Sequence, residues 1–332
     1  MGIKEFGGYF PLDLKKGNEY YRTCGSYEVR SLNSGRSAIY EAIIDSGAKN
    51  IWLPIYLCSS VNELLTAVNV SIKYYNIDED FMPVNITAYD DIVLYVNYFG
   101  IQPEDKISAV VKKYRRVILD NTQAFFCKPV ENAYNVYSCR KFFGVPDGSY
   151  LITDKFIHEQ KTLPGGVSYA TALFMLKALD MSTNEAYRDS LDNEARIEKE
   201  GVCSMSKLTR SILASIDYEE YREQRRKNYG ELCKSLNSIN EILPPSPADI
   251  NTYFAPMCYP LLIKSEGLRK YLVSNCIYVP QWWKSVISHP SANEWEKYIS
   301  QYLLPLPVDH RYSAEDMRYI AEVIMNYLNS NL

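Results

Sequence analysis

The sequence has few of the residues that build metal sites or disulfide frameworks. Only 3 of the 332 residues are histidine, and none of the 8 cysteines belongs to a C-x-x-C pair. Zinc sites usually draw on closely spaced cysteines and histidines, so no metal centre is expected. Disulfide frameworks are typical of short secreted chains, and the first residues, MGIKEFGGYFPLDL, contain no apolar signal segment. These absences favour a reduced, cytoplasmic protein.

Long apolar runs and excess positive charge are missing too. No stretch approaches the roughly 18 apolar residues of a membrane span. The net charge of -4 does not indicate the excess of positive charge that is typical of nucleic-acid-binding proteins. We therefore expect neither a membrane nor a nucleic-acid partner. With 47% hydrophobic residues, the chain has the composition of an ordinary globular protein that is long enough for two domains.

Short apolar runs alternate with helical patterns through the first half of the chain. This alternation predicts an α/β fold with a mostly parallel sheet that is covered on both faces. Strands are expected at 50–55, 70–77, 91–99, 115–120, 133–138 and 149–153, and helices at 34–46, 59–68 and 103–114.

Polar helical stretches dominate the second half, where 204–236 predicts one long helix. The stretch 242–257 is rich in proline and other helix breakers, which indicates a connector. We therefore predict a large domain over 1–205, and the long helix with a smaller C-terminal α+β domain over 206–332. The elements expected in the smaller domain are a strand at 259–263 and helices at 266–275 and 314–328.

Four short motifs follow predicted strands or open a predicted helix. In an open parallel sheet, ligands bind beyond the carboxyl ends of the strands, so these motifs would meet at one edge. The motifs are NSGRSA with Ser34, Gly35 and Arg36; LPIYLCSS with Tyr56 and Cys58; ILDNTQAFF with Asp120 and Gln123; and SCRKFFGVPDG with Ser138 and Lys141.

Each motif has a chemical and a structural interpretation. The glycine-containing helix start could bind an anion or be a plain N-cap. Asp120 could hold a protonated heterocycle or cap the next turn. Lys141 could be an amine for covalent chemistry or a surface charge. Either Tyr56 or Cys58 could lie over a flat ring, and Cys58 could equally be a small buried residue.

The order of the motifs is more informative than any one of them. A glycine-containing helix start comes first, and a strand-end Asp with Gln three residues later comes second. A Lys follows about twenty residues beyond the Asp. This is the order of the motifs in a pyridoxal-phosphate site. Such a site must bind the phosphate, pair the ring nitrogen with a carboxylate and supply a Schiff-base lysine.

The same stretches resemble the DegT/StrS-type nucleotide-sugar aminotransferases, which are pyridoxal-phosphate enzymes of fold type I. The likeness is carried by LNSGRSAI, LPIYLCSSV, YVNYFG, VILDNTQAF and KFFGVPDGSYLIT. The family pattern for the last of these stretches is a Lys, a short loop, an acidic residue, a Gly and then a strand. Lys141, Asp147 and Gly148 match this pattern. Two later stretches, EYREQRRKNYGEL and LLPLPVDHRYSAEDM, also resemble the family. The resemblance covers most of the chain and is strongest over 30–155.

The resemblance implies a role for each motif. Lys141 would carry the Schiff base and shuttle the proton, while Asp120 would keep the ring nitrogen protonated. Gln123 would lie against the ring or its 3-hydroxyl side, and Cys58 is a further candidate for cofactor binding. The phosphate would be held by Ser34, Gly35, Arg36 and Ser138.

The resemblance also implies a reaction and an assembly. Glutamate would give its amino group to a nucleotide-linked keto-sugar in two stages, through pyridoxamine phosphate, for surface polysaccharide or a related glycan. The active unit would be a homodimer with the cofactor at its interface.

Some features depart from the family pattern. Two residues separate Ser138 from Lys141, where four are usual, and Arg36 stands where Thr is common. The stretch GVCSM at 201–205 lacks the Asn and Arg of the family's Gly-x-Asn-x-Arg-Met. The candidates for a cross-subunit phosphate contact near this stretch are Ser204, Ser206 and Lys207.

Other interpretations remain open at this point. Trp282 and Trp283 could stack on a sugar or a base, or could pack in the core. The chain could be a non-catalytic relative that acts as a binding or regulatory protein. It could also be a sugar dehydratase, although dehydratases of this family replace the Schiff-base lysine, commonly by His, and Lys141 is present.

Overall fold

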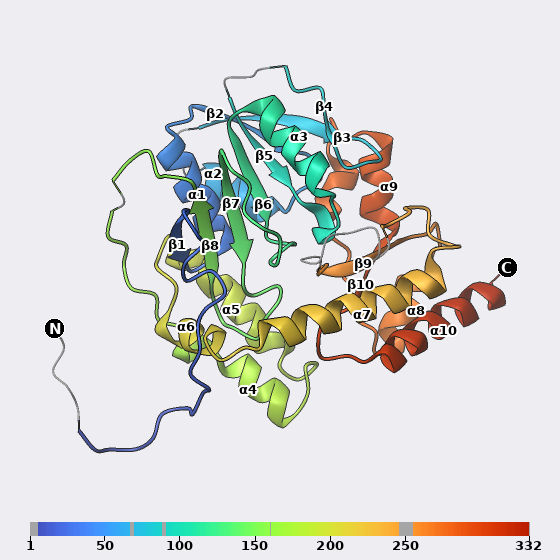
Figure 1. Ribbon diagram of the computed structural model, residues 1–332. Helices are drawn as coiled ribbons and strands as arrows, with labels where there is room; N and C mark the ends of the chain where they lie inside the picture. The colour runs from blue at the N-terminus through green and yellow to red at the C-terminus, as the bar shows by residue number, and fades with distance from the viewer. Residues whose placement is uncertain (1–5, 67–69, 88–90, 160, 246–254, 332) are drawn as a thin grey trace.

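The computed structural model describes residues 6–66, 70–87, 91–159, 161–245 and 255–331 (Figure 1). Its centre is a sheet with strand order β1-β8-β7-β6-β5-β2-β3-β4. The strands are β1 (Glu28–Leu32), β2 (Asn50–Pro54), β3 (Ser71–Ile77), β4 (Pro83–Val84), β5 (Ile92–Val96), β6 (Val117–Asn121), β7 (Ala133–Ser138) and β8 (Ser149–Thr153).

Helices cover both faces of this sheet. In Figure 1, α3 (Glu104–Tyr114) lies over the near face, while α1 (Gly35–Ser46) and α2 (Ser59–Thr66) lie on the far face. Every residue of β5, β6 and β8 is buried, and β5 is a continuous apolar run, as expected of a strand covered on both faces. The predicted α/β fold with a mostly parallel sheet is therefore confirmed.

The strand directions decide where the sequence motifs meet. Strands β3, β2, β5, β6 and β7 pair in parallel, in that order across the sheet. Strand β8 is antiparallel to both β7 and β1, so β1 runs in the same direction as the parallel strands. The carboxyl ends of β1, β2, β5, β6 and β7 therefore lie at one edge of the sheet.

The prediction of one long helix over 204–236 is wrong. Two helices occupy this range, α6 (Lys207–Leu213) and α7 (Tyr218–Leu236). Each begins at its own N-cap: the Ser206 hydroxyl accepts from the Thr209 N–H at 3.1 Å, and the Asp217 carboxylate accepts from the Glu220 N–H at 3.2 Å. Side chains that satisfy free helix N–H groups favour a new helix start, so the chain breaks between the two caps.

The rest of the second half forms a second, smaller sheet with helices. Strands β9 (Cys258–Leu262) and β10 (Leu303–Pro307) pair antiparallel, and α10 (Ala314–Ser330) packs beside α7 (Figure 1). The other helices are α4 (Leu173–Asp180), α5 (Tyr187–Glu200), α8 (Leu268–Ser274) and α9 (Glu294–Tyr302). Strands β1, β4 and β10 and helices α4, α5 and α9 were not predicted.

Some predictions differ in extent or fall outside the described residues. The strand expected at 91–99 ends at Val96 and gives way to a short 3₁₀ turn, Tyr98–Gly100. Residues 67–68 of one predicted helix and residues 246–254 of the predicted connector lie outside the ranges given above. Within those ranges, no helix is both long and apolar enough to cross a membrane.

Gly148 holds the loop between β7 and β8 in a conformation that other residues rarely adopt. Its φ is +118°, and a Cβ there would lie 2.9 Å from Thr209 Cγ2 and 3.2 Å from Cys139 Cβ. We predict that Gly148→Ala lowers the free energy of unfolding by about 2 kcal/mol. Urea unfolding measures this change.

Gly144, in the same loop, is the matched control. A Cβ at Gly144 would meet no atom within 4 Å, and the residue is exposed. Gly144→Ala should therefore change the unfolding free energy by less than about 0.5 kcal/mol. Equal losses in the two variants would contradict the role given to Gly148.

Candidate active site

A cavity of about 780 Å³ lies at the edge of the sheet where the parallel strands end. It brings together motifs that are far apart in the sequence. The predicted site residues that line it are Ser34, Gly35, Arg36, Cys58, Asp120, Gln123, Ser138 and Lys141. The second half of the chain supplies the facing wall, which includes Trp282, Trp283, Pro305 and Pro307.

Lys141 follows β7 and faces this cavity. Its side chain is exposed to the open cavity, while the protein around the amine removes part of its hydration. Desolvation lowers the pKa of the Lys141 amine below its ordinary value of 10.5, and the negative charge of Asp120 partly opposes this shift. The Nζ atom donates a hydrogen bond to Thr122 Oγ1 at 2.9 Å. An amine of this kind has a larger neutral, nucleophilic fraction than a surface lysine.

Asp120 lies near the end of β6 and is 5% exposed. Its Oδ1 atom accepts a hydrogen bond from the Thr122 backbone N–H at 2.9 Å, so it caps the turn after the strand. It also lines the cavity and acts electrostatically on Lys141. The structural and the chemical interpretation of this residue are thus compatible.

Thr122 was not singled out in the sequence, although it lies in the same DNTQ turn. Its backbone contacts Asp120 and its hydroxyl contacts Lys141, so it connects the two groups. A Cβ on Gly35 would lie 3.0 Å from Thr122 Cγ2. Glycine at position 35 therefore allows the start of α1 to approach this turn closely.

Gln123 is 2% exposed and is already partly engaged. Its Oε1 accepts from the Phe99 backbone N–H at 2.7 Å, which leaves the amide NH₂ as the group that could meet a ligand. Phe99, which has a φ of +60°, stacks on Trp282 with ring centroids 5.9 Å apart. Gln123 therefore also supports the aromatic wall of the cavity.

The two candidates for a ring contact near β2 have different surroundings. Tyr56 is fully buried and packs edge-on against Trp283 at 4.4 Å between ring centroids. Cys58 lines the cavity, with its Sγ 3.1 Å from Ser60 Oγ. Trp282 and Trp283 serve both as cavity wall and as packing partners, so the two interpretations of this pair are also compatible.

The start of α1 forms the other end of the cavity. Ser34 is the N-cap, and its hydroxyl accepts from the Ser37 N–H at 3.2 Å. The first N–H groups of a helix have no partner within the helix, so they can bind an anion. Ser138 and Arg140, which end and follow β7, line the same cavity. Arg140 was missed in the sequence because a lone arginine beside a lysine carries no signal of its own.

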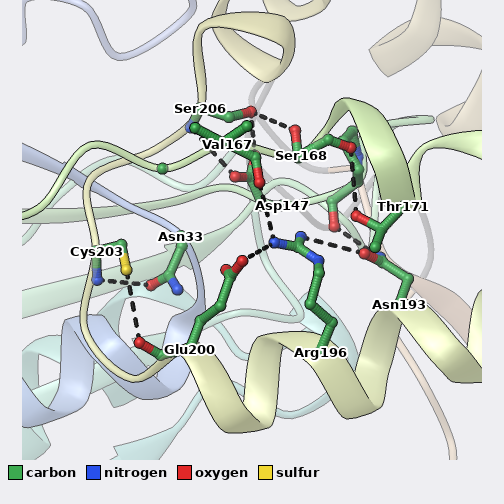
Figure 2. A network of polar contacts seen from close by, with 12 residues as sticks. Asn33, Asp147, Val167, Ser168, Thr171, Asn193, Arg196, Glu200, Cys203 and Ser206 are labelled. Carbon is green, nitrogen blue, oxygen red and sulfur yellow. Dashed lines mark hydrogen bonds and ion pairs between the residues drawn. The ribbon is translucent and has the colours of Figure 1, made fainter.

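The segment expected to reach a second subunit is anchored within its own chain (Figure 2). Asn33 Nδ2 donates to the Gly201 carbonyl at 2.9 Å, and the Ser206 hydroxyl donates to Asp147 Oδ1 at 2.9 Å. The Ser204 hydroxyl donates to the Pro164 carbonyl at 3.2 Å. Both serines thus have acceptors in the same chain, and the cross-subunit contact stays a prediction.

No protein-family model and no curated protein matches the chain. Solved structures of aminotransferases do match it, at 12–15% identity. A DegT DnrJ EryC1 StrS aminotransferase from Brucella abortus matches with a TM-score of 0.59, over 90% of this chain and 86% of that chain. NtdA from Bacillus subtilis with bound cofactor PMP matches at 0.58, over 90% and 73%. DesI in the presence of its TDP-sugar product matches at 0.58, over 90% and 79%.

These matches confirm the predicted fold. The first of the three is 14% identical to this chain, the second 14% and the third 12%. At such identity a match shows a shared fold, whereas function depends on the site. The protein has the fold of the DegT/DnrJ/EryC1/StrS aminotransferases, which is fold type I.

The surroundings of Lys141 predict its titration. Because burial lowers the pKa of its amine, acetylation of Lys141 should reach half of its maximal rate at a pH below 10.5. Thr122→Val removes the hydroxyl that accepts from the ammonium group, so it should lower this pH further, while Thr122→Ser should restore it. Mass spectrometry of the Lys141 peptide across a pH series measures the rate. A midpoint at or above 10.5 in the wild-type protein would contradict the burial argument.

Proposed function

We propose that the protein is a pyridoxal-phosphate-dependent aminotransferase that moves an amino group from glutamate to a nucleotide-linked keto-sugar. The observation that carries this proposal is the placement of Lys141 and Asp120 in one cavity at the strand ends of a fold type I chain. Surface polysaccharide or a related glycan is the proposed destination of the product. The proposal includes a cytoplasmic homodimer as the active unit.

The residues of the cavity fit this cofactor. Lys141 offers an amine of lowered pKa, and Asp120 offers a carboxylate for the ring nitrogen. The N-terminus of α1, with Ser34 and Ser138, offers hydrogen-bond donors for a phosphate. A volume of about 780 Å³ also lies within the usual range for a ligand site.

Each residue would make a distinct contribution to the reaction. The bound cofactor supplies an aldehyde that condenses with amines and a ring that accepts electrons from a bond at the substrate carbon. Asp120 would hold a proton on the ring nitrogen through a charge-assisted hydrogen bond. Lys141 would accept and return a proton at its Nζ, and Thr122 would hold the free Nζ through the hydrogen bond it accepts.

The aromatic wall would serve the acceptor. Trp282 and Trp283 line the cavity and offer flat apolar faces for a sugar or a base. The neighbours solved with PMP and with a TDP-sugar product support the choice of cofactor and acceptor class. For the homodimer, α4 offers an apolar surface, because Leu173, Leu176 and Leu179 are each more than half exposed.

Product analysis tests this function. Pyridoxal-phosphate-loaded protein is incubated with glutamate and a panel of nucleotide-linked keto-sugars. We expect 2-oxoglutarate and an amino sugar in equal amounts with at least one acceptor. Cofactor binding without 2-oxoglutarate in any mixture would contradict the proposal and favour a non-catalytic binding protein.

Asp120→Asn separates chemistry from binding. An amide cannot keep the ring nitrogen protonated, so turnover should fall by about 100-fold or more while the cofactor still binds. Asp154→Asn is the matched control, because Asp154 follows β8 at the opposite edge of the sheet and is exposed. The control should keep full turnover. An Asp120→Asn enzyme as active as the control would remove Asp120 from this role.

A further inference from the structure

Two arginines lie together at the α1 end of the cavity. Arg36 is the second residue of α1, and Arg140 follows β7. Both line the cavity beside Ser34 and Ser138. Burial lowers the pKa of Arg140 to about 10, and the positive charge of Arg36 adds to this shift, so the two guanidinium groups repel one another.

Each arginine pairs with a carboxylate of α5, and both carboxylates also line the cavity. Arg36 Nη1 lies 3.2 Å from Glu198 Oε1, and Arg140 forms an ion pair with Glu194. The two glutamates are four residues apart, so they lie on one face of α5. Their side chains are half-exposed, whereas both arginine side chains are largely buried. The carboxylates therefore orient the arginines at the rim of the cavity and offset part of their positive charge.

These ion pairs leave part of each guanidinium group available. A guanidinium carries five N–H donors in a planar fork, and one carboxylate can take at most two of them along one edge. The remaining donors belong to side chains that line the cavity. The positive end of the α1 dipole and the Lys141 amine add to the positive charge at this place.

We propose that Arg36 and Arg140 complete, within a single chain, the subsite for the phosphate dianion of the cofactor. A phosphate monoester carries two negative charges and several acceptor oxygens, which match two guanidinium forks and a helix N-terminus. The hydroxyls of Ser204 and Ser206, in the segment expected to reach across a dimer, already donate within their own chain. Arg140 takes the place of a contact from a second subunit. This inference rests on the proposed function for the identity of the ligand.

Binding of pyridoxal phosphate and of pyridoxal, which lacks the phosphate, tests the subsite without any turnover. The dissociation constants are measured by absorbance for the wild-type protein, Arg36→Gln and Arg140→Gln. Each variant should bind pyridoxal phosphate roughly 10- to 100-fold more weakly, because a charge-assisted hydrogen bond is lost. Pyridoxal should bind equally to all three proteins. Arg188→Gln, an exposed arginine of α5, is the matched control and should bind both compounds as the wild type does.

The outcomes separate the subsite from the reaction. Equal weakening for both compounds would show a merely structural role for the arginines, and unchanged binding of pyridoxal phosphate would also overturn the proposal. A wild-type protein that prefers pyridoxal phosphate but makes no amino sugar would contradict the proposed function and still support the phosphate subsite. Sedimentation at the same dilutions tests the single-chain claim: a monomer that keeps its affinity supports it, and affinity lost with the dimer contradicts it.

Discussion

The site depends on the cost of placing the Lys141 ammonium group where the surrounding protein removes part of its hydration. Burying a charge is unfavourable unless an opposite charge or hydrogen bonds compensate for it, and here Asp120 and Thr122 provide both for Lys141. The turn that carries Asp120 and Thr122 meets Lys141 because β6 and β7 are parallel neighbours. The residues at and after their carboxyl ends therefore lie side by side. Gly35 belongs to the same arrangement, since any side chain at that position would press on Thr122.

One wall of the cavity is built by aromatic packing between distant parts of the chain. Trp282 stacks on Phe99, whose backbone N–H is held by Gln123, and Trp283 packs on Tyr56. The turn after β6 therefore contributes to the amine environment through Thr122 and to the aromatic wall through Gln123. A substitution at Gln123 would affect the wall as well as any ligand.

Much of the fold and the site could be predicted from the sequence. Strands β7 and β8 have the predicted bounds, and the predicted site residues line one cavity because parallel strands end at one edge. The contacts of Thr122 and Arg140 depend on loop conformation, which leaves no periodic pattern. The break before α7 was missed because Ser206 and Asp217 look like ordinary polar residues of a helix. The division into domains at 205/206 stays a prediction.

The most direct measurement is to locate the lysine that reacts with the cofactor. The protein is incubated with pyridoxal phosphate, reduced with borohydride, digested and analysed by mass spectrometry. The account predicts one pyridoxyl-modified peptide, which contains Lys141. It also predicts loss of this adduct in Lys141→Ala and its retention in Lys155→Ala, a change of an exposed lysine just after β8. A specific adduct on another lysine that persists in Lys141→Ala would contradict the account.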